Sequence, residues 1–379
     1  MKSTIMRSLA VFGVAAVGTL GLVGCSSDSA SDAASDVSTA ASSAAQDAKE
    51  SIQGLSGQSG TLNGEGASSQ QNAMEYFKVQ YANAVDGANL NYTASGSGSG
   101  QKQFIAGQVD FGGSDSPLKD DQIEPAKERC GGNDAWHLPL VIGPVAVAYN
   151  LQGADDVTLS PEVIAKIFNG KITNWNDPAI AELNGGTALP DKDIKVIFRS
   201  EESGTSDNFQ KFLKAAAPAE WDTTGKAFPS KVGSGANSST GVVGEVKKTD
   251  GAITYVESGF AKNENLGIAK IDFGNGPVEL NKESVNKALA NIDFAGEGHD
   301  LVVDAESLFQ INEAGAYPLV LTTYEIVCSA GYDAETSARV KDFLTVALNN
   351  QDENLEKIGY VPVDGEYKAA LEEAVNAIQ

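Results

Sequence analysis

Two long extended segments lie far apart in the chain, at residues 137–150 and 317–327. Both are rich in apolar and β-branched residues, which favour buried strands. Around them, short apolar runs alternate with helical patterns, which is typical of an α/β fold. We expect a chain that leaves one domain along the first segment and returns along the second. This predicts a two-domain clamshell that closes on a ligand about a two-strand hinge.

The first 25 residues have the pattern of a lipoprotein export signal. Lys2 and Arg7 precede a mostly apolar run that is short and Gly-rich for a membrane span. The run ends in Leu22-Val23-Gly24-Cys25, which is similar to a bacterial lipobox, in which the cysteine becomes lipidated. An ordinary cleaved signal with an incidental cysteine is the alternative. We therefore expect an extracytoplasmic protein that Cys25 anchors through a lipid to the outer face of the cell membrane.

Residues 26–59 form a tract rich in Ser, Ala and Asp that has few large apolar side chains. Such a segment buries too little surface to offset the entropy of ordering, so we expect a disordered tether. We expect the rest of the chain to form two domains. The first consists of residues 60–142 and 318–379, and the second consists of residues 143–317.

Acidic residues dominate the charge of the chain. There are 51 Asp and Glu residues against 27 Lys and Arg residues, which gives a formal net charge of −24. The resulting field repels nucleic acid, and it also repels an anionic ligand at a distance. An anion site in this chain must therefore depend on oriented donors that act at short range.

Cys130 and Cys328 are the cysteines that remain beyond Cys25. Two leftover cysteines usually pair outside the cytoplasm, so we expect a disulfide, with two buried free thiols as the alternative. The sequence has no CxxC motif and no Cys/His cluster. We therefore expect no metal site and no cofactor.

Three loops of small residues each precede a predicted helix, at residues 64–69, 95–100 and 199–206. A helix N-terminus exposes unpaired N–H groups and a partial positive charge, to which glycines give close access and hydroxyls add donors. Each loop alone could be a capped helix start or a flexible turn. The second is not a Walker A loop, because no Gly-Lys-Ser/Thr follows it. Three such loops, one of them with Arg199, predict an oxyanion cradle.

Asp115 follows a predicted strand at residues 109–112. An ionised carboxylate is only an acceptor, so it can receive a hydrogen bond from phosphate, which keeps a proton at neutral pH. It would repel sulfate, which keeps none, and so would select against it. Taken alone, Asp115 could equally be a turn or cap residue.

Four segments together resemble the phosphate-binding protein of the bacterial phosphate ABC transporter, the PstS family. They are Gly64-Glu65-Gly66-Ala67-Ser68-Ser69, Gly96-Ser97-Gly98-Ser99-Gly100, residues 110–118 and residues 199–205. The resemblance runs from about Leu62 to the C-terminus. It implies the periplasmic-binding-protein fold and a monomeric solute-binding protein. Such a protein binds inorganic phosphate in the inter-domain cleft and delivers it to the permease subunits of an ABC importer.

The resemblance also implies a set of phosphate contacts, position by position. Ser68 stands where the family has threonine, and Ser69 stands where many members have phenylalanine, so only the backbone N–H of Ser69 transfers. Arg199 would supply the cation, and Glu201 would orient it. The implied phosphate-binding residues are Ser68, Ser69, Ser97, Asp115, Arg199, Ser203, Gly204 and Thr205.

A phosphatase or another hydrolase is the chief rival function. Catalysis would need a metal cluster or an activated nucleophile. The histidines are His137 and His299, neither lies in a metal-spacing motif, and no GxSxG motif is present. We therefore expect no catalytic residue and no enzyme activity. Two further rivals are a binding protein for sulfate or molybdate, against which Asp115 argues, and a tethered phosphate sensor or adhesin that lacks an importer.

Overall fold

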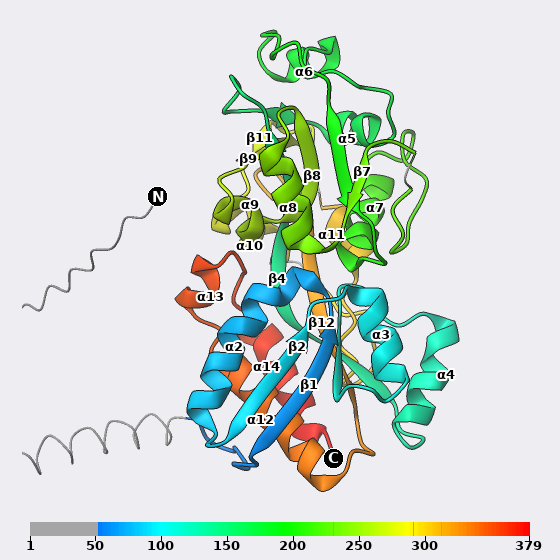
Figure 1. The fold of residues 1–379 in the computed structure, drawn as a ribbon, viewed down its shortest axis with the longest axis vertical. Coiled ribbons are helices and arrows are strands. Elements are labelled where there is room, and N and C mark those ends of the chain that lie inside the picture. The colour runs from blue at the N-terminus through cyan, green and yellow to red at the C-terminus, as the bar shows by residue number, and fades with distance from the viewer. Residues whose placement is uncertain (1–51, 230, 291, 312) are drawn as a thin grey trace, which may run out of the picture. The chain divides into compact units, whose positions relative to one another are not determined.

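The computed structural model describes residues 52–379 except residues 230, 291 and 312 (Figure 1). The expected export signal, the lipobox Cys25 and residues 26–51 of the expected tether lie outside the described residues. In the described part of the chain, no helix is long and apolar enough to cross a membrane.

The first lobe is an α/β unit that occupies the lower half of Figure 1. It holds the N-terminal half of the long strand β4 (Ala135–Asn150). Its other elements are β1 (Gly60–Gly66), η1 (Ser68–Gln70), α2 (Gln71–Ala84), β2 (Ala88–Thr93), α3 (Ser97–Ile105), β3 (Phe111–Ser114), α4 (Asp120–Arg129), β12 (Val320–Cys328), α12 (Ala334–Asn349), α13 (Glu353–Lys357) and α14 (Gly365–Ala377).

The second lobe occupies the upper half of Figure 1 and holds the C-terminal half of β4. Its other elements are β5 (Thr158–Leu159), α5 (Pro161–Phe168), α6 (Pro178–Leu183), β6 (Lys195–Arg199), α7 (Gly204–Ala216), β7 (Ser234–Ala236), α8 (Ser238–Lys248), β8 (Ala252–Glu257), α9 (Ser258–Asn263), β9 (Gly267–Ile268), β10 (Lys270–Asp272), β11 (Pro277–Val278), α10 (Lys282–Leu289) and α11 (Ala305–Phe309).

One sheet runs through both lobes in the order β2-β1-β3-β12-β4-β8-β6-β7, with β9 also paired to β4. β4 joins the halves: residues 135–144 pair antiparallel with β12, and residues 145–150 pair antiparallel with β8. The second expected crossing lies beside the first, because Val145 N donates to Leu319 O at 3.0 Å. Tyr317 Oη also donates to Val145 O at 2.8 Å. Both extended segments singled out in the sequence therefore pass the same point between the lobes.

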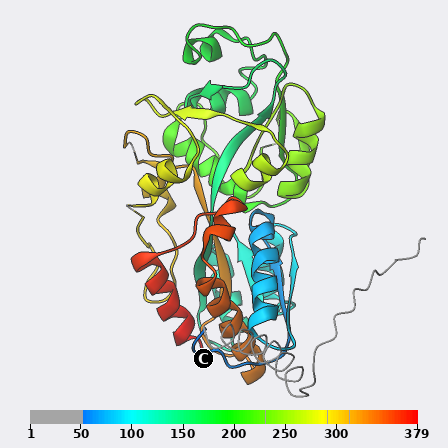
Figure 2. The same ribbon diagram turned by 90° about the vertical axis from the view of Figure 1, so that its left-hand side faces the viewer.

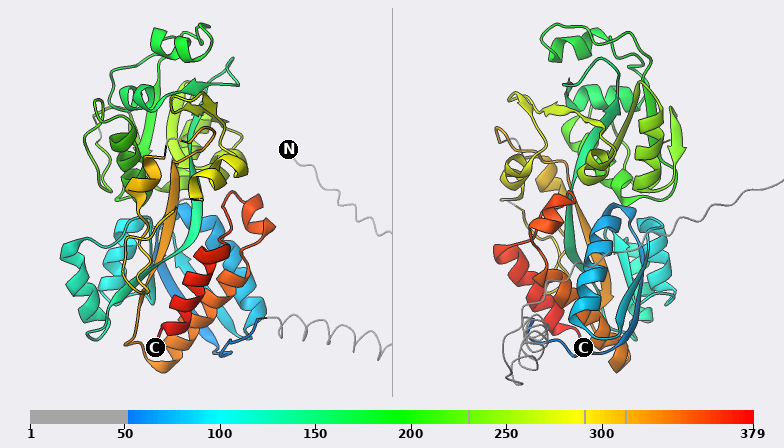
Figure 3. Two further views of the ribbon diagram at one scale, coloured as in Figure 1. Left: turned by 180° about the vertical axis from the view of Figure 1, so that it is seen from behind. Right: turned by 60° about the vertical axis from the view of Figure 1, so that its left-hand side comes forward.

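Helices cover both faces of each half of the sheet. In the first lobe, α2, α12 and α14 lie on one side, and α3 and α4 lie on the other (Figures 1 and 3). In the second lobe, α5 and α7 pack on the side of Tyr255, whose ring stacks on Phe209 at 4.4 Å between centroids. Figure 2 shows β4 passing from one lobe into the other. Burial on both faces explains why every residue of β12 and nearly every residue of β4 is buried.

The folded part begins before the position expected from the sequence. We expect the tether to run to residue 59, but Ser56 N and Ser56 Oγ donate to the Asp342 carboxylate at 2.7 and 2.8 Å. Gly57 N donates to the same carboxylate at 3.0 Å, and Leu55 packs against the core. The composition of this stretch did not reveal these bonds, because the partner lies on α12, near the other end of the chain.

The chain also passes between the lobes outside the two expected crossings. Asp300, which we expect in the second domain, accepts from His137 N in the first lobe at 2.7 Å. Leu301 N donates to His137 O at 3.0 Å, and Val303 N donates to Tyr324 Oη at 3.1 Å. The segment around these residues therefore packs on the first lobe before the chain reaches β12. The expected domain boundaries at residues 142 and 317 leave out this excursion and otherwise remain a prediction.

Two predicted helices begin earlier than their sequence patterns indicate. The pattern predicts a helix from Gln101, but α3 begins at Ser97, within the Gly/Ser loop. The pattern predicts another from Asn208, but α7 begins at Gly204 after the cap residue Ser203. The reason is that the N–H groups of a first helical turn need no helical acceptor, so glycine and serine are tolerated there.

Cys130 and Cys328, which are 198 positions apart in the sequence, form a disulfide in the structure. Cys130 follows α4 and Cys328 ends β12, so the bond ties a helix of the first lobe to the strand that returns there. Both cysteines are fully buried in a small apolar cluster with Phe104 and Ile326.

Candidate functional site

The predicted loops and Asp115 come together where the two lobes meet. The first lobe contributes η1, the start of α3 and the loop after β3, and the second lobe contributes the end of β6 and the start of α7. The residues involved are all buried, with Asp115 7% and Arg199 3% exposed. We call this set the inter-lobe cluster: Ser68, Ser69, Ser97, Asp115, Arg199, Ser203, Gly204 and Thr205.

Asp115 is the centre of one hydrogen-bond group in the inter-lobe cluster. Its Oδ1 accepts from Ser69 Oγ at 2.5 Å and from Thr323 Oγ1 at 2.7 Å. Its Oδ2 accepts from Ser97 Oγ at 3.1 Å. The side chain is thus held in place by hydroxyls from η1, α3 and β12.

The environment of Asp115 favours its protonated form more than water does. Burial, followed by the negative charge of Glu257, raises the pKa of Asp115 to about 6 from its ordinary value of 3.8. The hydrogen bonds from Ser69 and Thr323 and the charge of Arg199 act in the opposite direction. Asp115 is therefore a better proton acceptor than an exposed aspartate.

The start of α7 packs directly against the first lobe. Gly204 N donates to Ser97 Oγ at 3.2 Å. A Cβ atom at Gly204 would lie 2.5 Å from both Asp115 Cβ and Ser97 Oγ, a distance that real side chains do not tolerate. Glycine is therefore required where the N-termini of α3 and α7 meet.

Arg199 is the centre of the second hydrogen-bond group. Its Nη2 donates to Ser68 Oγ at 2.7 Å, and its Nη1 donates to Thr205 Oγ1 at 3.2 Å and to Ser239 Oγ at 3.3 Å. Its Nε donates to Glu201 Oε1 at 2.7 Å, so Glu201 orients the guanidinium in the way the resemblance implies. The planar fork of the arginine thus links both lobes through several hydroxyls at once.

Two predicted loop features have other partners in the structure. The hydroxyl of Ser203 caps α7, because its Oγ accepts from Ser206 N at 3.3 Å. Glu65, in the first of the three loops, accepts from Ser95 Oγ at 2.7 Å and from Ser99 Oγ at 2.6 Å. In the second loop, the hydroxyls of Ser95 and Ser99 therefore donate to Glu65. The hydroxyl of Ser97, in the same loop, donates to Asp115 instead.

Three residues of the site were missed in the sequence analysis. Ser239 N donates to Ser68 Oγ at 3.0 Å, and Glu257 accepts from Thr205 Oγ1 at 2.8 Å. Thr323 bonds to Asp115. Ser239 could have been found, because residues 233–240 are a fourth run of small residues at the start of a helix, here α8. Glu257 and Thr323 gave no such signal, since each ends or interrupts an apolar strand.

Both histidines lie outside the inter-lobe cluster. The Nε2 of His137 accepts from Leu118 N at 2.9 Å, so its proton is on Nδ1, which bonds to Asp300 Oδ1 at 2.7 Å. His299 packs edge-on against Trp136. Both rings have structural partners. Among the described residues, no group of three or more His, Cys, Asp or Glu side chains could hold a metal ion.

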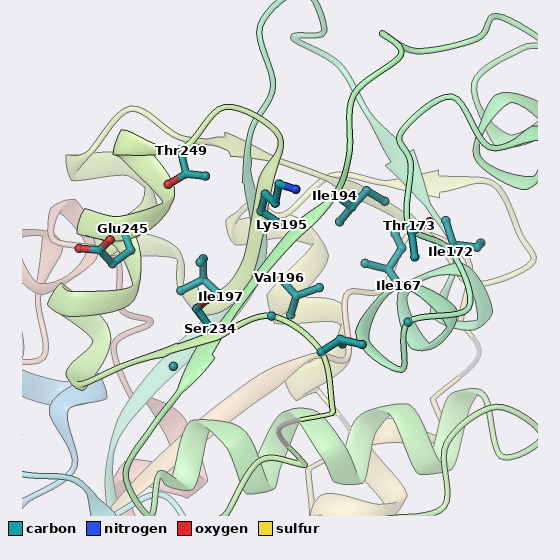
Figure 4. A pocket seen from close by; sticks show the side chains of 14 residues that line it. Ile167, Ile172, Thr173, Ile194, Lys195, Val196, Ile197, Ser234, Glu245 and Thr249 are labelled. Carbon is teal, nitrogen blue, oxygen red and sulfur yellow. The ribbon is translucent and has the colours of Figure 1, made fainter.

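A cavity of about 590 Å³ adjoins the inter-lobe cluster at Asp115. It is lined from the first lobe by Thr322 and Tyr324, and from the second by Asn208 and Lys211. Another cavity, of about 540 Å³, lies in the second lobe (Figure 4). Six of its 14 lining residues are branched aliphatic, Ile167 among them, and it shares no lining residue with the cluster. Only the first of these two cavities is placed to give access to the cluster.

Known proteins resemble this chain over most of its length. It matches the PBP superfamily domain over residues 38–351. It is 43% identical over 372 residues to the phosphate-binding protein PstS 3 of Mycobacterium leprae, which covers 97% of this chain and 98% of that one. It is 33% identical over 321 residues to the phosphate-binding protein PstS of Pasteurella multocida, which covers 82% of this chain and 89% of the other.

A solved structure supports the fold independently. The phosphate-binding protein from Stenotrophomonas maltophilia superimposes with a TM-score of 0.63 at 22% identity, over 83% of this chain and 93% of that one. The two-domain α/β clamshell expected from the sequence is thereby confirmed. The named relatives are binding proteins, which is the class that the sequence analysis favours over an enzyme. The chain therefore belongs to the PBP superfamily and, within it, to the PstS family of phosphate-binding proteins.

Proposed function

We propose that this protein binds inorganic phosphate in the inter-lobe cluster and delivers it to an ABC importer. One observation carries the proposal: hydroxyl and N–H donors and one guanidinium from both lobes converge beside a buried carboxylate. Donors alone would suit any oxyanion, whereas Asp115 requires a ligand that can give it a proton. Phosphate is the common oxyanion that meets both conditions at neutral pH.

The chemistry of the cluster divides into two roles. Arg199 and the N–H groups at the starts of η1, α3 and α7 stabilise the negative oxygens of phosphate. Asp115, with its raised pKa, accepts the hydrogen bond of a protonated oxygen. Sulfate would place an unprotonated oxygen against this carboxylate, so we expect the site to reject it.

The binding energy needed is modest. Micromolar affinity corresponds to about 8 kcal/mol. Hydrogen bonds to charged groups contribute roughly 1.5–3 kcal/mol each, so about ten of them supply this amount after the costs of ordering and closure. The net charge of −24 does not prevent binding, because oriented dipoles act at short range.

The N-terminal sequence supports the proposed location. We propose that Cys25 carries a lipid that anchors the protein to the outer face of the cell membrane, with the following tract as a tether. Its partners would be the permease subunits of a phosphate ABC transporter, and it would act as a monomer. Replacing Cys25 with alanine should release the protein from the membrane fraction, whereas retention would refute the lipid anchor.

Calorimetric titration tests the proposed function. Phosphate should bind at micromolar or tighter concentration with one site per chain, and a hundredfold excess of sulfate should not displace it. In parallel, the protein should not hydrolyse a chromogenic phosphate ester. Absence of phosphate binding would refute the proposal, and hydrolysis of the ester would favour a hydrolase instead.

A further inference from the structure

Lys226 is a buried lysine of the second lobe that contacts the first lobe. Only 8% of the residue is exposed. Its Nζ donates to Oε1 of Gln101, a fully buried residue of α3. Neither residue belongs to the phosphate contacts that the family resemblance implies. The hydrogen bond between them therefore has no role in the proposed function as described so far.

The main chain around Lys226 is fixed to α7 of the second lobe. Gln210 Nε2 donates to Gly225 O at 2.6 Å. Lys226 O accepts from the N–H of Ser203, the residue that caps α7, at 3.0 Å. The segment therefore moves with the second lobe, and its ammonium can reach Gln101 only while the two lobes are together.

Gln101 in turn holds the loop that carries Asp115. Its Nε2 donates to Ser116 O at 2.8 Å and to Pro117 O at 3.2 Å. Carbonyl oxygens are only acceptors, so the amide nitrogen must face them and the amide oxygen must face Lys226. A lysine of one lobe thus completes the hydrogen bonds of the residue that positions the Asp115 loop in the other lobe.

The ammonium of Lys226 is buried, and it forms no ion pair with a carboxylate among the described residues. Burial, followed by the charge of Lys119, lowers the pKa of Lys226. Lys102 acts in the same direction, whereas Asp207 and Glu202 raise this pKa. Both other lysines lie in the first lobe and both acids lie in the second, so closing an empty site brings positive charges together. Burying an ammonium is costly unless negative charge is supplied nearby.

We propose that Lys226 is a positioning residue that couples lobe closure to phosphate capture: its ammonium is buried against Gln101 when the lobes close, and the negative charge of the bound anion offsets the cost of that burial. This inference rests on the proposed function of phosphate binding. Gln101 lies one turn of α3 beyond Ser97, so the ammonium adds a positive charge behind the helix start that faces Asp115. In the low dielectric of the closed junction, this charge attracts the anion more strongly than it would in water.

The test compares the rates of phosphate association and release in the parent, Lys226→Met and Lys226→Gln. Methionine removes the charge and the donor, whereas glutamine keeps an amide donor without the charge. Both variants should release phosphate at least fivefold faster. Their association rates should stay within threefold of the parent's, because one charge hardly changes the long-range field of a chain with net charge −24. A smaller rise in release in either variant that folds, or a larger change in association, would overturn the inference. Failure of the parent to bind phosphate would instead refute the proposed function.

Lys231→Met is a matched control, because it removes the same charge from an exposed position nearby in the second lobe. Its release rate should rise less than fivefold, and a larger rise would show an effect of net charge alone and would overturn the inference.

Small-angle X-ray scattering without phosphate separates this coupling from a simple lock between the lobes. Empty Lys226→Met should be no more open than the empty parent, because no ammonium has to be buried when its lobes close. A larger radius of gyration than the parent's would mean that Lys226 holds the lobes together without an anion, which would contradict the inference.

Discussion

The Nη2 of Arg199 lies 2.7 Å from the Oγ of Ser68, and this hydrogen bond joins the end of β6 in the second lobe to η1 in the first. Ser239 N donates to the same Oγ from the start of α8 at 3.0 Å. A ligand held by these groups would contact both lobes at once. Affinity and lobe closure should therefore change together when the residues of this junction are altered.

Arg199→Ala should weaken phosphate binding at least tenfold. The remaining donors are neutral dipoles, and Glu201 would be left without its arginine partner. Arg199→Lys should give an intermediate affinity, because an ammonium keeps the charge but not the planar fork. Calorimetric titration measures the phosphate affinity of both variants. An alanine variant with the parent's affinity would show that Arg199 does not contact the phosphate.

Asp115→Asn should reduce the preference for phosphate over sulfate at least tenfold. The asparagine amide can donate to an unprotonated oxygen, and it no longer repels a dianion. Competition titration gives the ratio of the two dissociation constants. The matched control is Asp121→Asn, an exposed position on α4. Equal ratios of the sulfate and phosphate dissociation constants in both variants would show that Asp115 does not select phosphate by its proton.

Ser116→Ala should speed phosphate release several-fold. Ser116 Oγ donates across the lobe boundary to Asp207 Oδ2 at 2.7 Å, and both residues are buried. The nearby ion pair between Lys102 and Glu202 also crosses the boundary, but both of its side chains are about half exposed or more. Exposed pairs contribute little, so Lys102→Ala should leave the release rate within about twofold. Stopped-flow release measurements with equal rates for Ser116→Ala and Lys102→Ala would contradict this ranking.

Glu325 should make the protein less stable as the pH rises. It is fully buried, and burial raises its pKa to about 8 from the ordinary value of 4.5. Between these values the unfolded chain loses the proton before the folded chain does, so the stability present below pH 4.5 declines until pH 8. Gln70 Nε2 donates to Glu325 Oε2 at 3.3 Å, while Gln70 Oε1 and Glu325 Oε1 have no partner among the described residues. Both of these oxygens are acceptors without a donor, and protonation gives Glu325 an O–H group of its own.

Thermal unfolding at pH 6 and pH 8 measures this effect. The parent protein should unfold at a lower temperature at pH 8, and Glu325→Gln should reduce the difference, because glutamine has no proton to lose. Asp115, with a pKa of about 6, changes the stability mainly below pH 6 and so contributes little to the difference between pH 6 and pH 8. Identical differences in the parent and the variant would exclude Glu325 as the source.

Removing the disulfide should lower the free energy of unfolding. The bond between Cys130 and Cys328 closes a loop of 198 positions, for which the chain-entropy model gives about 5 kcal/mol. The double variant with alanine at both positions avoids placing polar groups in this apolar cluster. Urea denaturation should show a clearly lower midpoint, and an unchanged midpoint would mean that the bond does not constrain the unfolded chain.

The sequence predicted those parts of the site that lie in local patterns. Ser97 and Gly204 lie in Gly/Ser segments where helices begin, and Arg199 ends the strand before one of them, so the chemistry of a helix N-terminus can be predicted from a few consecutive residues. The two extended segments likewise indicated the crossings between lobes. Glu257 and Thr323 could not be found this way, because their roles depend on which strands become neighbours in the folded sheet. The excursion around Asp300 was missed for the same reason, since it is fixed by contacts to His137 far away in the chain.

A crystal structure of the phosphate complex tests the central claim most directly. We expect one phosphate in the inter-lobe cluster, with one oxygen within hydrogen-bonding distance of the Asp115 carboxylate and others bound by Arg199 and by the N–H groups that begin α3 and α7. Phosphate bound at another place, or bound with Asp115 and Arg199 both out of reach, would contradict the account.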